Sequence, residues 1–383
     1  MTWLRASRIR TQQPRAWLQV RGVPITPTSQ RARLTVKAVL ICNPAAGGRS
    51  CSDEILEACA YLESEGWEVA PIRMTRGPGD ATTFAREAAA EGADVVFIAG
   101  GDGSVAQAVD GLVGTDVALG LLPAGTGNVM ARQLNLPIPS PLNPRPMVEA
   151  ARLLSAGQIR KVDVGRMSFT GSDLPVRHFL LWGGIGLDAA FNQEFNRDPM
   201  RKRRLPPVAF MAAAYLTIKD FAGTSATVRI DGKVVSRRLL LLVASNIQVY
   251  AIVIKLGRAV IDDGWLDAVL YQGRGIAHSL RYGAGWLLRQ TVPDPEIEYY
   301  RARRIEVSTT RALPVHVDGD QIGTTPITIE VVPGALNLLV PATAPGSLFS
   351  DGAASTNRET LLDWMRRGAR EAQTAIKDRS IWS

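Results

Sequence analysis

Short apolar runs alternate with amphipathic segments through residues 38–132. Apolar runs bounded by turn residues are typical of strands buried on both faces, and apolar residues at helical spacing indicate helices with one buried face. The predicted strands are Ala38–Cys42, Trp67–Ala70, Val95–Ala99 and Val117–Leu122, and the predicted helices are Ser52–Ser64, Asp80–Ala90 and one that follows Ser104. This alternation predicts a parallel sheet with helices on both faces.

The pattern changes after the proline-rich stretch Pro137–Pro146, where strand-like segments dominate. The dipeptides Asp231-Gly232 and Asp318-Gly319 are strong hairpin signals, so we expect a second domain made mainly of antiparallel sheet. The predicted strands lie at 161–167, 176–181, 226–230, 237–244, 266–271, 304–308, 315–317, 327–331 and 335–340, and the predicted helices at 147–156, 207–221 and 278–289. The domains are expected at 38–158 and 159–341, flanked by an arm (1–37) and a linker with a helix (342–383).

Three turns rich in small or polar residues follow predicted strands, at 43–50, 100–104 and 123–128. Ligands of parallel sheets bind at the carboxyl ends of the strands, so we expect these turns to converge. Glycine lets a backbone approach a phosphate closely, and the start of a helix favours an anion. Asp102 would repel phosphates unless a divalent cation lies between them. The turns therefore indicate a site for a nucleotide with its metal.

The net charge of +8 is concentrated at the N-terminus. Residues 1–37 hold eight Arg and Lys and no acid, which leaves 36 basic and 36 acidic residues elsewhere, so we expect no nucleic-acid partner for the body of the protein. Such an arm is typical of a disordered tail, a membrane-surface or nucleic-acid contact, or a transit peptide.

Two further features limit where the protein works. The three cysteines, at 42, 51 and 59, show no metal-binding spacing, which favours a reducing compartment. The longest apolar run, Leu239–Ile254, contains Asn246 and Gln248 and is shorter than the roughly 20 residues that a spanning helix needs. A pair of buried strands around a polar bend explains this run better.

The motifs Asn43-Pro44-Ala45-Ala46-Gly47, Gly100–Ser104 and Gly125-Thr126-Gly127-Asn128 resemble, in order and spacing, those of the diacylglycerol kinase catalytic domain. That family includes bacterial lipid kinases and the sphingosine and ceramide kinases. The resemblance covers about residues 38–341 and extends to segments 162–165, 184–189, 262–267 and 317–320. It implies an α/β plus β fold: an N-terminal Rossmann-like nucleotide domain and a C-terminal β-sandwich domain, with the site in the cleft between them.

The resemblance also implies roles for individual residues. Asp102 is expected to bind or organise Mg²⁺, and Asp320 stands where the family has the glutamate that serves as general base toward the lipid hydroxyl. Because aspartate is one methylene shorter, its backbone has to approach the acceptor more closely. The expected ATP-binding residues are Asn43, Pro44, Gly47, Gly100, Gly101, Gly103, Ser104, Gly125, Thr126, Gly127 and Asn128.

Asp263 and Asp267 resemble a second, structural Mg²⁺ site, and Asp163 is assigned to the same acidic network. The alternatives are a hairpin turn with solvated acids for the pair and a turn-capping acid for Asp163. Two departures from the family pattern are visible. Val129 stands where many members have aspartate, and 251–254 replaces a glycine run, so a loop near the acceptor is expected to be more apolar or differently shaped.

The expected activity is ATP-dependent phosphorylation of a diacylglycerol-like or sphingoid-like alcohol by a cytoplasmic protein, peripheral at the inner membrane surface. The expected partners are the lipid and the membrane surface, and a homodimer is left open. The basic segment 197–204 before apolar 208–216 suits anionic headgroups or a solvated charge run, and the tail 358–377 is expected to dock on the protein. The alternatives are a soluble kinase similar to NAD kinases and a non-catalytic lipid- or nucleotide-binding protein.

Overall fold

The computed structural model describes residues 35–46, 52–196, 224–250, 254–255, 259–272 and 297–351. Several predictions from the sequence lie outside these residues: the arm at 1–34, Gly47, the basic segment 197–204, the helices at 207–221 and 278–289, the altered loop at 251–253 and the tail at 358–377.

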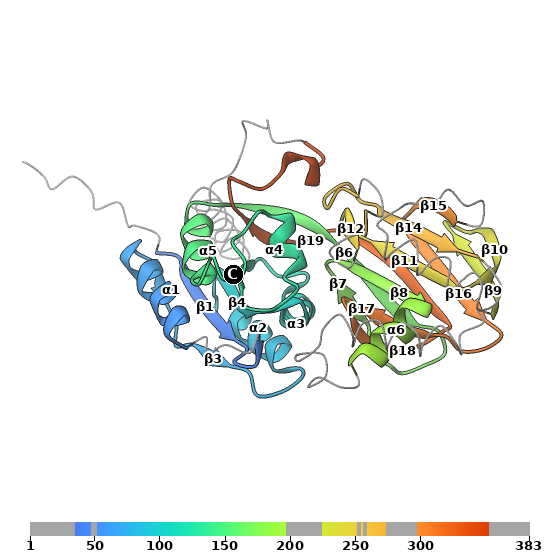
Figure 1. Ribbon diagram of the computed structural model, residues 1–383, viewed down its shortest axis with the longest axis horizontal. Helices are drawn as coiled ribbons and strands as arrows, with labels where there is room; N and C mark the ends of the chain where they lie inside the picture. Colours follow the sequence, from blue (N-terminus) through green and yellow to red (C-terminus); the bar gives the residue numbers. More distant parts are fainter. Residues whose placement is uncertain are drawn as a thin grey trace, which may run out of the picture. The chain divides into compact units, whose positions relative to one another are not determined.

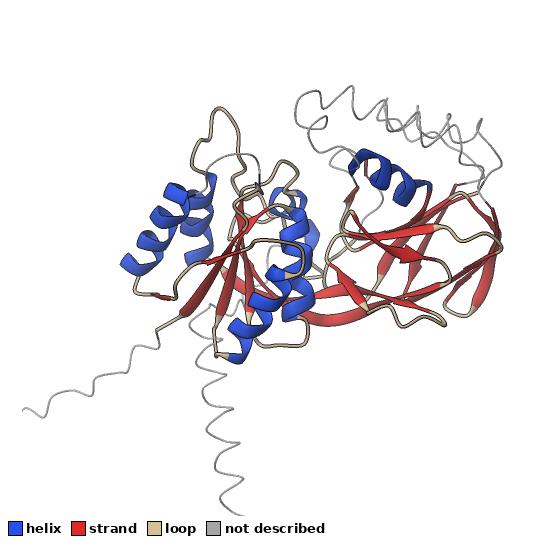
Figure 2. Ribbon diagram, turned by 90° about the horizontal axis from the view of Figure 1, so that it is seen from below, coloured by secondary structure: helices blue, strands red, loops and turns tan. Residues whose placement is uncertain are grey.

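Strands and helices alternate in the first part of the described chain, as predicted (Figure 1). Figure 2 shows helices on both faces of its strands; α1 packs against α5, and α2 packs against α3. The parallel strands pair in the order β2-β1-β4-β5. The elements are β1 (Lys37–Cys42), α1 (Ser52–Ser64), β2 (Glu68–Val69), β3 (Arg73–Met74), α2 (Asp80–Ala90), β4 (Val95–Gly100), α3 (Asp102–Leu112), β5 (Ala118–Pro123), α4 (Val129–Gln133) and α5 (Pro146–Ser155).

The central strands of this sheet are apolar because both of their faces are covered. All six residues of β4 and all six of β5 are buried, and they share one core with the buried faces of the flanking helices. Strands of this kind carry no alternation of polar residues, which is why the sequence shows them as continuous apolar runs. Their carboxyl ends open into the turns at 100–104 and 123–128.

The second part of the chain is mainly antiparallel, and the fold class predicted from the sequence is confirmed. One of its sheets has the order β15-β14-β11-β8-β17-β18. The elements are β6 (Gln158–Phe169), β7 (Arg177–Phe179), β8 (Trp182–Gly186), α6 (Leu187–Asn196), β9 (Thr224–Ile230), β10 (Lys233–Leu239), β11 (Leu241–Ser245), β12 (Val249–Tyr250), β13 (Ile254–Lys255), β14 (Leu266–Tyr271), β15 (Ile297–Ala302), β16 (Arg304–Thr309), β17 (Pro314–Val317), β18 (Asp320–Thr324), β19 (Ile327–Val340) and the 3₁₀-helix η2 (Gly346–Leu348).

Both Asp-Gly hairpin signals correspond to two-residue turns. Asp231 and Gly232 join β9 to β10 with φ values of +47° and +83°, and Asp318 and Gly319 join β17 to β18 with +47° and +92°. Positive φ at both central residues is the geometry that matches the twist of a hairpin and that Asp-Gly adopts readily. The second of these turns places Asp320 at the first position of β18.

The long strand β19 belongs to both parts of the structure. Its first half pairs antiparallel with β16, from Ile327↔Val307 to Glu330↔Arg304, and its end pairs parallel with β5 at Asn337↔Ala118 and Leu338↔Leu119. Strand β6 follows β19 along nearly its whole length. A single sheet therefore runs through the expected domain boundary near residue 158, and β19 is the last strand added to the α/β part.

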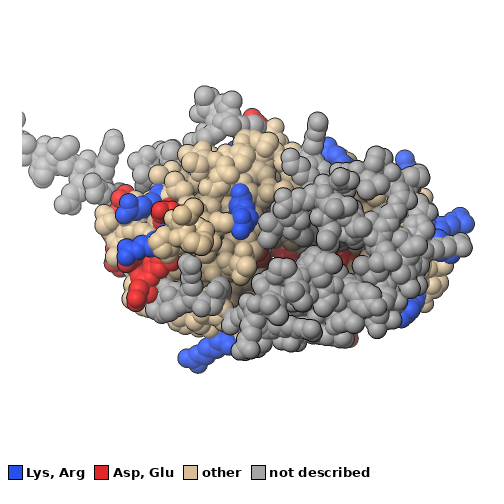
Figure 3. All heavy atoms as spheres, in the orientation of Figure 1, with Lys and Arg blue, Asp and Glu red and all other residues tan. Residues whose placement is uncertain are grey.

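The described surface shows no large region of one charge in the view of Figure 3, where lysines and arginines are interspersed with acidic and other residues. Among the residues that the structure describes, no helix combines the length and apolar character needed to cross a membrane.

Candidate active site

The glycine turn after β4 leads directly into helix α3. Gly101 is the N-cap residue, and its carbonyl oxygen accepts hydrogen bonds from the N–H groups of Ser104 (3.0 Å) and Val105 (3.1 Å). The first N–H groups of a helix have no carbonyl one turn earlier to bind, so those that precede Ser104 favour an anion. Because Gly100 sits against Ser104, a side-chain carbon there would lie 2.8 Å from Ser104 Cβ, so the turn is closed too tightly for any other residue.

The third turn packs on the second, backbone against backbone. A side-chain carbon at Gly125 would lie 2.6 Å from the Cα of Gly101, and the N–H of Ala124 donates to the carbonyl oxygen of Gly100 at 3.0 Å. Glycine is therefore required at this contact by space alone. The two turns, which we predicted to converge from their places after neighbouring strands, form one continuous surface.

Asn128 stabilises its own turn. It adopts the left-handed conformation with φ +49°, its Oδ1 accepts from Gly125 N–H at 3.0 Å, and its Nδ2 donates to the Gly125 carbonyl at 2.6 Å. The side chain is 4% exposed, so it shapes the loop from inside. The sequence assigned Asn128 to ATP binding; the contacts seen here also give it a role in fixing the turn at Gly125.

Asp102 lies at the junction of the two turns. Its Oδ1 accepts a 2.6 Å hydrogen bond from the N–H of Val129, which starts α4, and a side-chain carbon at Gly127 would lie 2.4 Å from its Oδ2. Burial raises the pKa of Asp102, against the lowering effect of hydrogen bonds from the backbone at 128–130. Val129 thus contributes its backbone N–H to a carboxylate at the place where many family members carry a second acid.

The first turn joins the others through one side-chain pair. Nδ2 of Asn43 donates to Ser104 Oγ at 3.0 Å, while its Oδ1 accepts from the N–H of Ala45. The backbone N–H of Asn43 also donates to the Ala99 carbonyl at 2.9 Å. Asn43 therefore fixes the start of the first turn, at Pro44, to the helix that follows the second turn.

The Asp318-Gly319 turn brings a second carboxylate to this place. Both oxygens of Asp318 face inward, where they accept from the N–H groups of Leu180 (3.0 Å), Leu181 (3.0 Å) and Trp182 (2.9 Å). Burial raises the pKa of Asp318 to about 7, with Asp102 adding to the effect. Asp318 is consequently an anchor of the turn, and its neighbour Asp320 is the acid that remains at the surface of the site.

Asp320 lies beside the first turn of α3. Its Oδ1 is 4.0 Å from the position that a side-chain carbon on Gly103 would occupy. Burial raises the pKa of Asp320, while the positive charge of Arg177 opposes the rise. The structure therefore brings together the expected base and the glycine turn, although they are far apart in the sequence.

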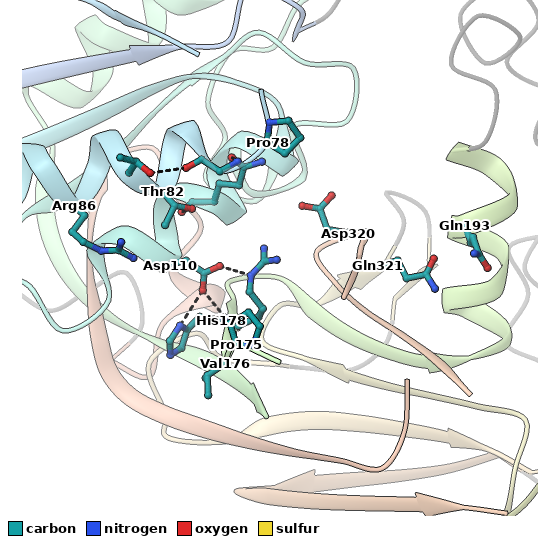
Figure 4. Close-up of a pocket in the computed structure, with 15 residues that line it drawn as sticks. Pro78, Thr82, Arg86, Asp110, Pro175, Val176, His178, Gln193, Asp320 and Gln321 are labelled. Atoms are coloured by element: carbon teal, nitrogen blue, oxygen red, sulfur yellow. Dashed lines mark hydrogen bonds and ion pairs between the residues drawn. The ribbon is translucent and has the colours of Figure 1, made fainter. Parts of the chain in front are cut away.

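A cavity of about 780 Å³ opens at Asp320. Figure 4 shows Asp320 and Gln321 on one side and Thr82 and Arg86 of α2 on the other, with Asp110 and His178 along the wall. The lining combines polar side chains with apolar surface, to which Pro78, Pro175 and Val176 contribute. The cavity is therefore suited to a polar group that reacts next to Asp320.

Arg177 is a residue of this wall that the sequence did not reveal. Its Nε contacts Asp110 Oδ2 at 2.5 Å, and Asp110 Oδ1 accepts from the N–H of His178 at 2.8 Å. Burial alone would raise the pKa of Asp110, but the hydrogen bonds from His178 and Arg177 outweigh it and lower the pKa below its ordinary value. The pair joins α3 to β7 over a separation of 67 residues in the chain, so no local motif predicts it.

The acids of the expected second metal site have partners within the protein. Asp163 accepts from Gly264 N–H (2.6 Å) and Gly334 N–H (2.8 Å), which is a turn-capping role, and Arg301 lies 2.6 Å from Asp263 and 3.9 Å from Asp267. In the described part of the chain, no group of three His, Cys, Asp or Glu side chains is arranged to hold a metal ion. Arg301 provides the opposite charge at Asp263 and Asp267, and Mg²⁺ at these acids stays a prediction.

Asp102 does fit a magnesium ion that is bound through phosphates. Mg²⁺ usually takes one or two carboxylates together with substrate phosphate oxygens and water, so a single acid at the phosphate turns is sufficient. Asp102 uses Oδ1 for the backbone of Val129, and the glycine at 127 leaves space beside Oδ2. These residues accommodate the ion that the family resemblance implies.

Comparison with known proteins agrees with this geometry. Residues 37–167 match the family model "Diacylglycerol kinase catalytic domain", and residues 184–340 match "YegS C-terminal NAD kinase beta sandwich-like domain". Diacylglycerol kinases from Bacillus subtilis and Mycobacterium tuberculosis (H37Rv) are 25% and 29% identical, over 76% and 80% of this chain and 91% and 95% of theirs.

Solved structures give the same fold. The crystal structure of a diacylglycerol kinase from Bacillus anthracis has a TM-score of 0.58 at 22% identity, and another structure from the same strain has 0.64 at 23%. Both comparisons cover 80% of this chain and 98% of the other. The chain therefore belongs to the diacylglycerol kinase catalytic-domain family, with that domain followed by the β-sandwich domain of the YegS type.

Proposed function

We propose that this chain is an ATP-dependent lipid kinase that phosphorylates the hydroxyl group of a diacylglycerol-like or sphingoid-like alcohol. One observation carries the proposal: Asp320 Oδ1 lies 4.0 Å from the side-chain position of Gly103, the residue that follows Asp102 in the chain. Phosphoryl transfer needs a phosphate cradle and a base for the acceptor hydroxyl within reach of each other. The family match supports the reaction class, and the site geometry supports these residues.

In this proposal the backbone N–H groups at the start of α3 and those of Thr126 and Gly127 bind the phosphates of ATP. Asp102 holds Mg²⁺, which neutralises phosphate charge when bound. Asp320 accepts the proton of the acceptor hydroxyl, and burial helps because a raised pKa makes a carboxylate a stronger base. Arg177, held by Asp110, places a positive charge on the wall of the same cavity.

A soluble acceptor is the second candidate, and the cavity lining favours it. In the cavity at Asp320, the side chains of Thr82, Gln107 and Gln321 offer hydrogen bonds to a polar acceptor. A lipid alcohol would place only its headgroup there, whereas a small polar alcohol would be enclosed entirely. Membrane binding of the whole chain, and a peripheral location at the inner membrane surface, are part of the lipid-kinase proposal.

The test is phosphate transfer from radiolabelled ATP by the full chain. The acceptors are dioleoylglycerol and sphingosine in mixed vesicles, and glycerol and NAD in solution. We expect transfer to one of the lipids only, and a loss of roughly 10²- to 10⁴-fold in kcat for Asp320→Asn. Asp320→Glu, which restores the family's residue, should retain more activity than Asp320→Asn. Asp173→Asn is the matched control because Asp173 is exposed in a loop.

The possible outcomes separate the candidates. Transfer to soluble acceptors alone would replace the lipid-kinase proposal with the second candidate. Nucleotide binding without transfer to any acceptor, unchanged in Asp102→Asn, would indicate a non-catalytic protein. Sedimentation of the chain with anionic vesicles, compared with neutral ones, tests the membrane partner separately.

A further inference from the structure

A buried histidine–aspartate pair lies behind the turn that carries Asp320. His316 on β17 is fully buried, the side chain of Asp188 at the start of α6 is 3% exposed, and His316 Nε2 is hydrogen-bonded to Asp188 Oδ2. Gly184 of β8, which pairs with His316, provides the space: a side-chain carbon there would lie 2.1 Å from both contacting atoms. The interior of this sheet therefore accommodates the pair by having glycine at position 184.

The other ring nitrogen of His316 reaches the turn itself. The N–H of Gly319 donates to His316 Nδ1 at 3.2 Å. An imidazole that accepts at Nδ1 carries its proton on Nε2, the atom that faces Asp188, so the carboxylate selects the tautomer that the turn requires. Both ring nitrogens are used in this way, and the ring is not available to a substrate.

The turn is thus held from two sides. Asp318 is fixed by three backbone N–H groups at 180–182, and Gly319 is fixed by His316, which leaves Asp320 as the next residue with a defined direction. Gly319 has φ +92°, and the hydrogen bonds of Asp318 and Gly319 restrict the backbone of the turn on both sides of this bend. A shift of about 1 Å in a catalytic group can cost roughly 10²-fold in rate.

We propose that His316, oriented by Asp188, is a positioning residue that aims Asp320 at the acceptor hydroxyl. The inference rests on the proposed function, because it assigns the purpose of the turn to the base. Neither His316 nor Asp188 touches the substrate in this proposal. The turns around Asp102 are held by other hydrogen bonds, such as that from the N–H of Val129 to Asp102.

Two substitutions separate this role from a purely structural one. His316→Asn places an amide oxygen near the position of Nδ1, so it keeps an acceptor for Gly319 and loses the contact with Asp188. His316→Gln places its terminal group near Nε2, so it keeps the contact with Asp188 and leaves the Gly319 N–H without its acceptor. His316→Phe removes both.

We expect kcat of His316→Gln and His316→Phe to fall roughly 10²-fold with KM for ATP unchanged, and His316→Asn to keep a kcat well above both, although it loses the contact with Asp188. Thermal unfolding of each variant shows the stability cost. A kcat for His316→Gln within twofold of wild type, or kcat values that follow stability in all three variants, would overturn the proposal.

Hydrogen exchange of the Gly319 amide gives a readout that needs no substrate. Protection should fall in His316→Gln and remain in His316→Asn, and ¹⁵N NMR of the wild type should show the tautomer with its proton on Nε2 and Nδ1 as the acceptor. The opposite tautomer would overturn the inference. Failure of the proposed function would appear differently, as a wild type inert toward every lipid with the Gly319 amide still protected.

Discussion

Asp320 Oδ1 lies 4.0 Å from the place where a side-chain carbon on Gly103 would stand. A side-chain carbon there would make ordinary van der Waals contact with the carboxylate, so Asp320 lies beside the turn without crowding it. Asp320 comes from the β17–β18 hairpin and Gly103 from the first turn of α3. The base and the phosphate cradle are therefore already adjacent in this conformation.

Gly127→Ala should displace Asp102. The added carbon would lie 2.4 Å from Asp102 Oδ2, a distance that no side chain tolerates, so the carboxylate has to move. We expect at least a tenfold loss in kcat for ATP turnover with the circular dichroism spectrum retained. Gly77→Ala is the matched control, because nothing lies within 4 Å of its side-chain position, and it should behave as wild type.

Gly125→Ala should cost stability as well as activity. Its new carbon would lie 2.6 Å from the Cα of Gly101, and a backbone atom cannot turn aside as a side chain can. Overpacking of this kind typically costs about 1–3 kcal/mol. Urea unfolding monitored by fluorescence measures the change, and a midpoint equal to that of wild type would contradict the backbone contact.

The rate should fall on the acid side as Asp320 becomes protonated. Burial raises the pKa of this carboxyl and Arg177 holds the rise in check, so removing the cation raises the pKa further. Arg177→Met should therefore shift the acidic limb of the kcat/KM profile to higher pH. Arg166→Met, which loses an ion pair with Glu330 instead, should leave the limb in place.

Asp318 should make the fold less stable as pH rises. Its pKa in the folded protein is raised to about 7 by burial, above the ordinary value of 3.8, so between these limits the folded state holds more protons than the unfolded state. Stability then falls with rising pH by up to about 1.4 kcal/mol per unit and is fully present below pH 3.8. Denaturant midpoints of wild type and Asp318→Asn from pH 4 to 7 should diverge in this direction.

Arg301→Ala should make the loop at 263–267 sensitive to Mg²⁺. In the wild type Arg301 faces the carboxylates of Asp263 and Asp267, and it is 56% exposed, so its loss should cost less than about 1 kcal/mol. Without the arginine, Mg²⁺ in the absence of ATP should raise the melting temperature of the variant and leave that of wild type unchanged. An equal rise in both proteins would support a metal site at these acids.

Local chemistry made much of this site predictable. The glycine turns follow buried strands, and the Asp-Gly signal at 318–319 gave the hairpin that presents Asp320. The pairing of Asp263 and Asp267 with Arg301 could not be predicted, because Arg301 lies on β15 and belongs to no motif. The hydrogen bonds between Asn128 and Gly125 could not be predicted either, because they depend on the left-handed backbone at Asn128.

The sequence by itself determined the elements and their chemistry. Strand, turn and helix preferences act over a few residues, so apolar runs, glycine turns and hairpin dipeptides can be recognised wherever they occur. Only the tertiary structure decided which distant residues meet: Arg177 with Asp110, His316 with Asp188, and the end of β19 with β5. These contacts depend on packing between segments far apart in the chain, which no local pattern encodes.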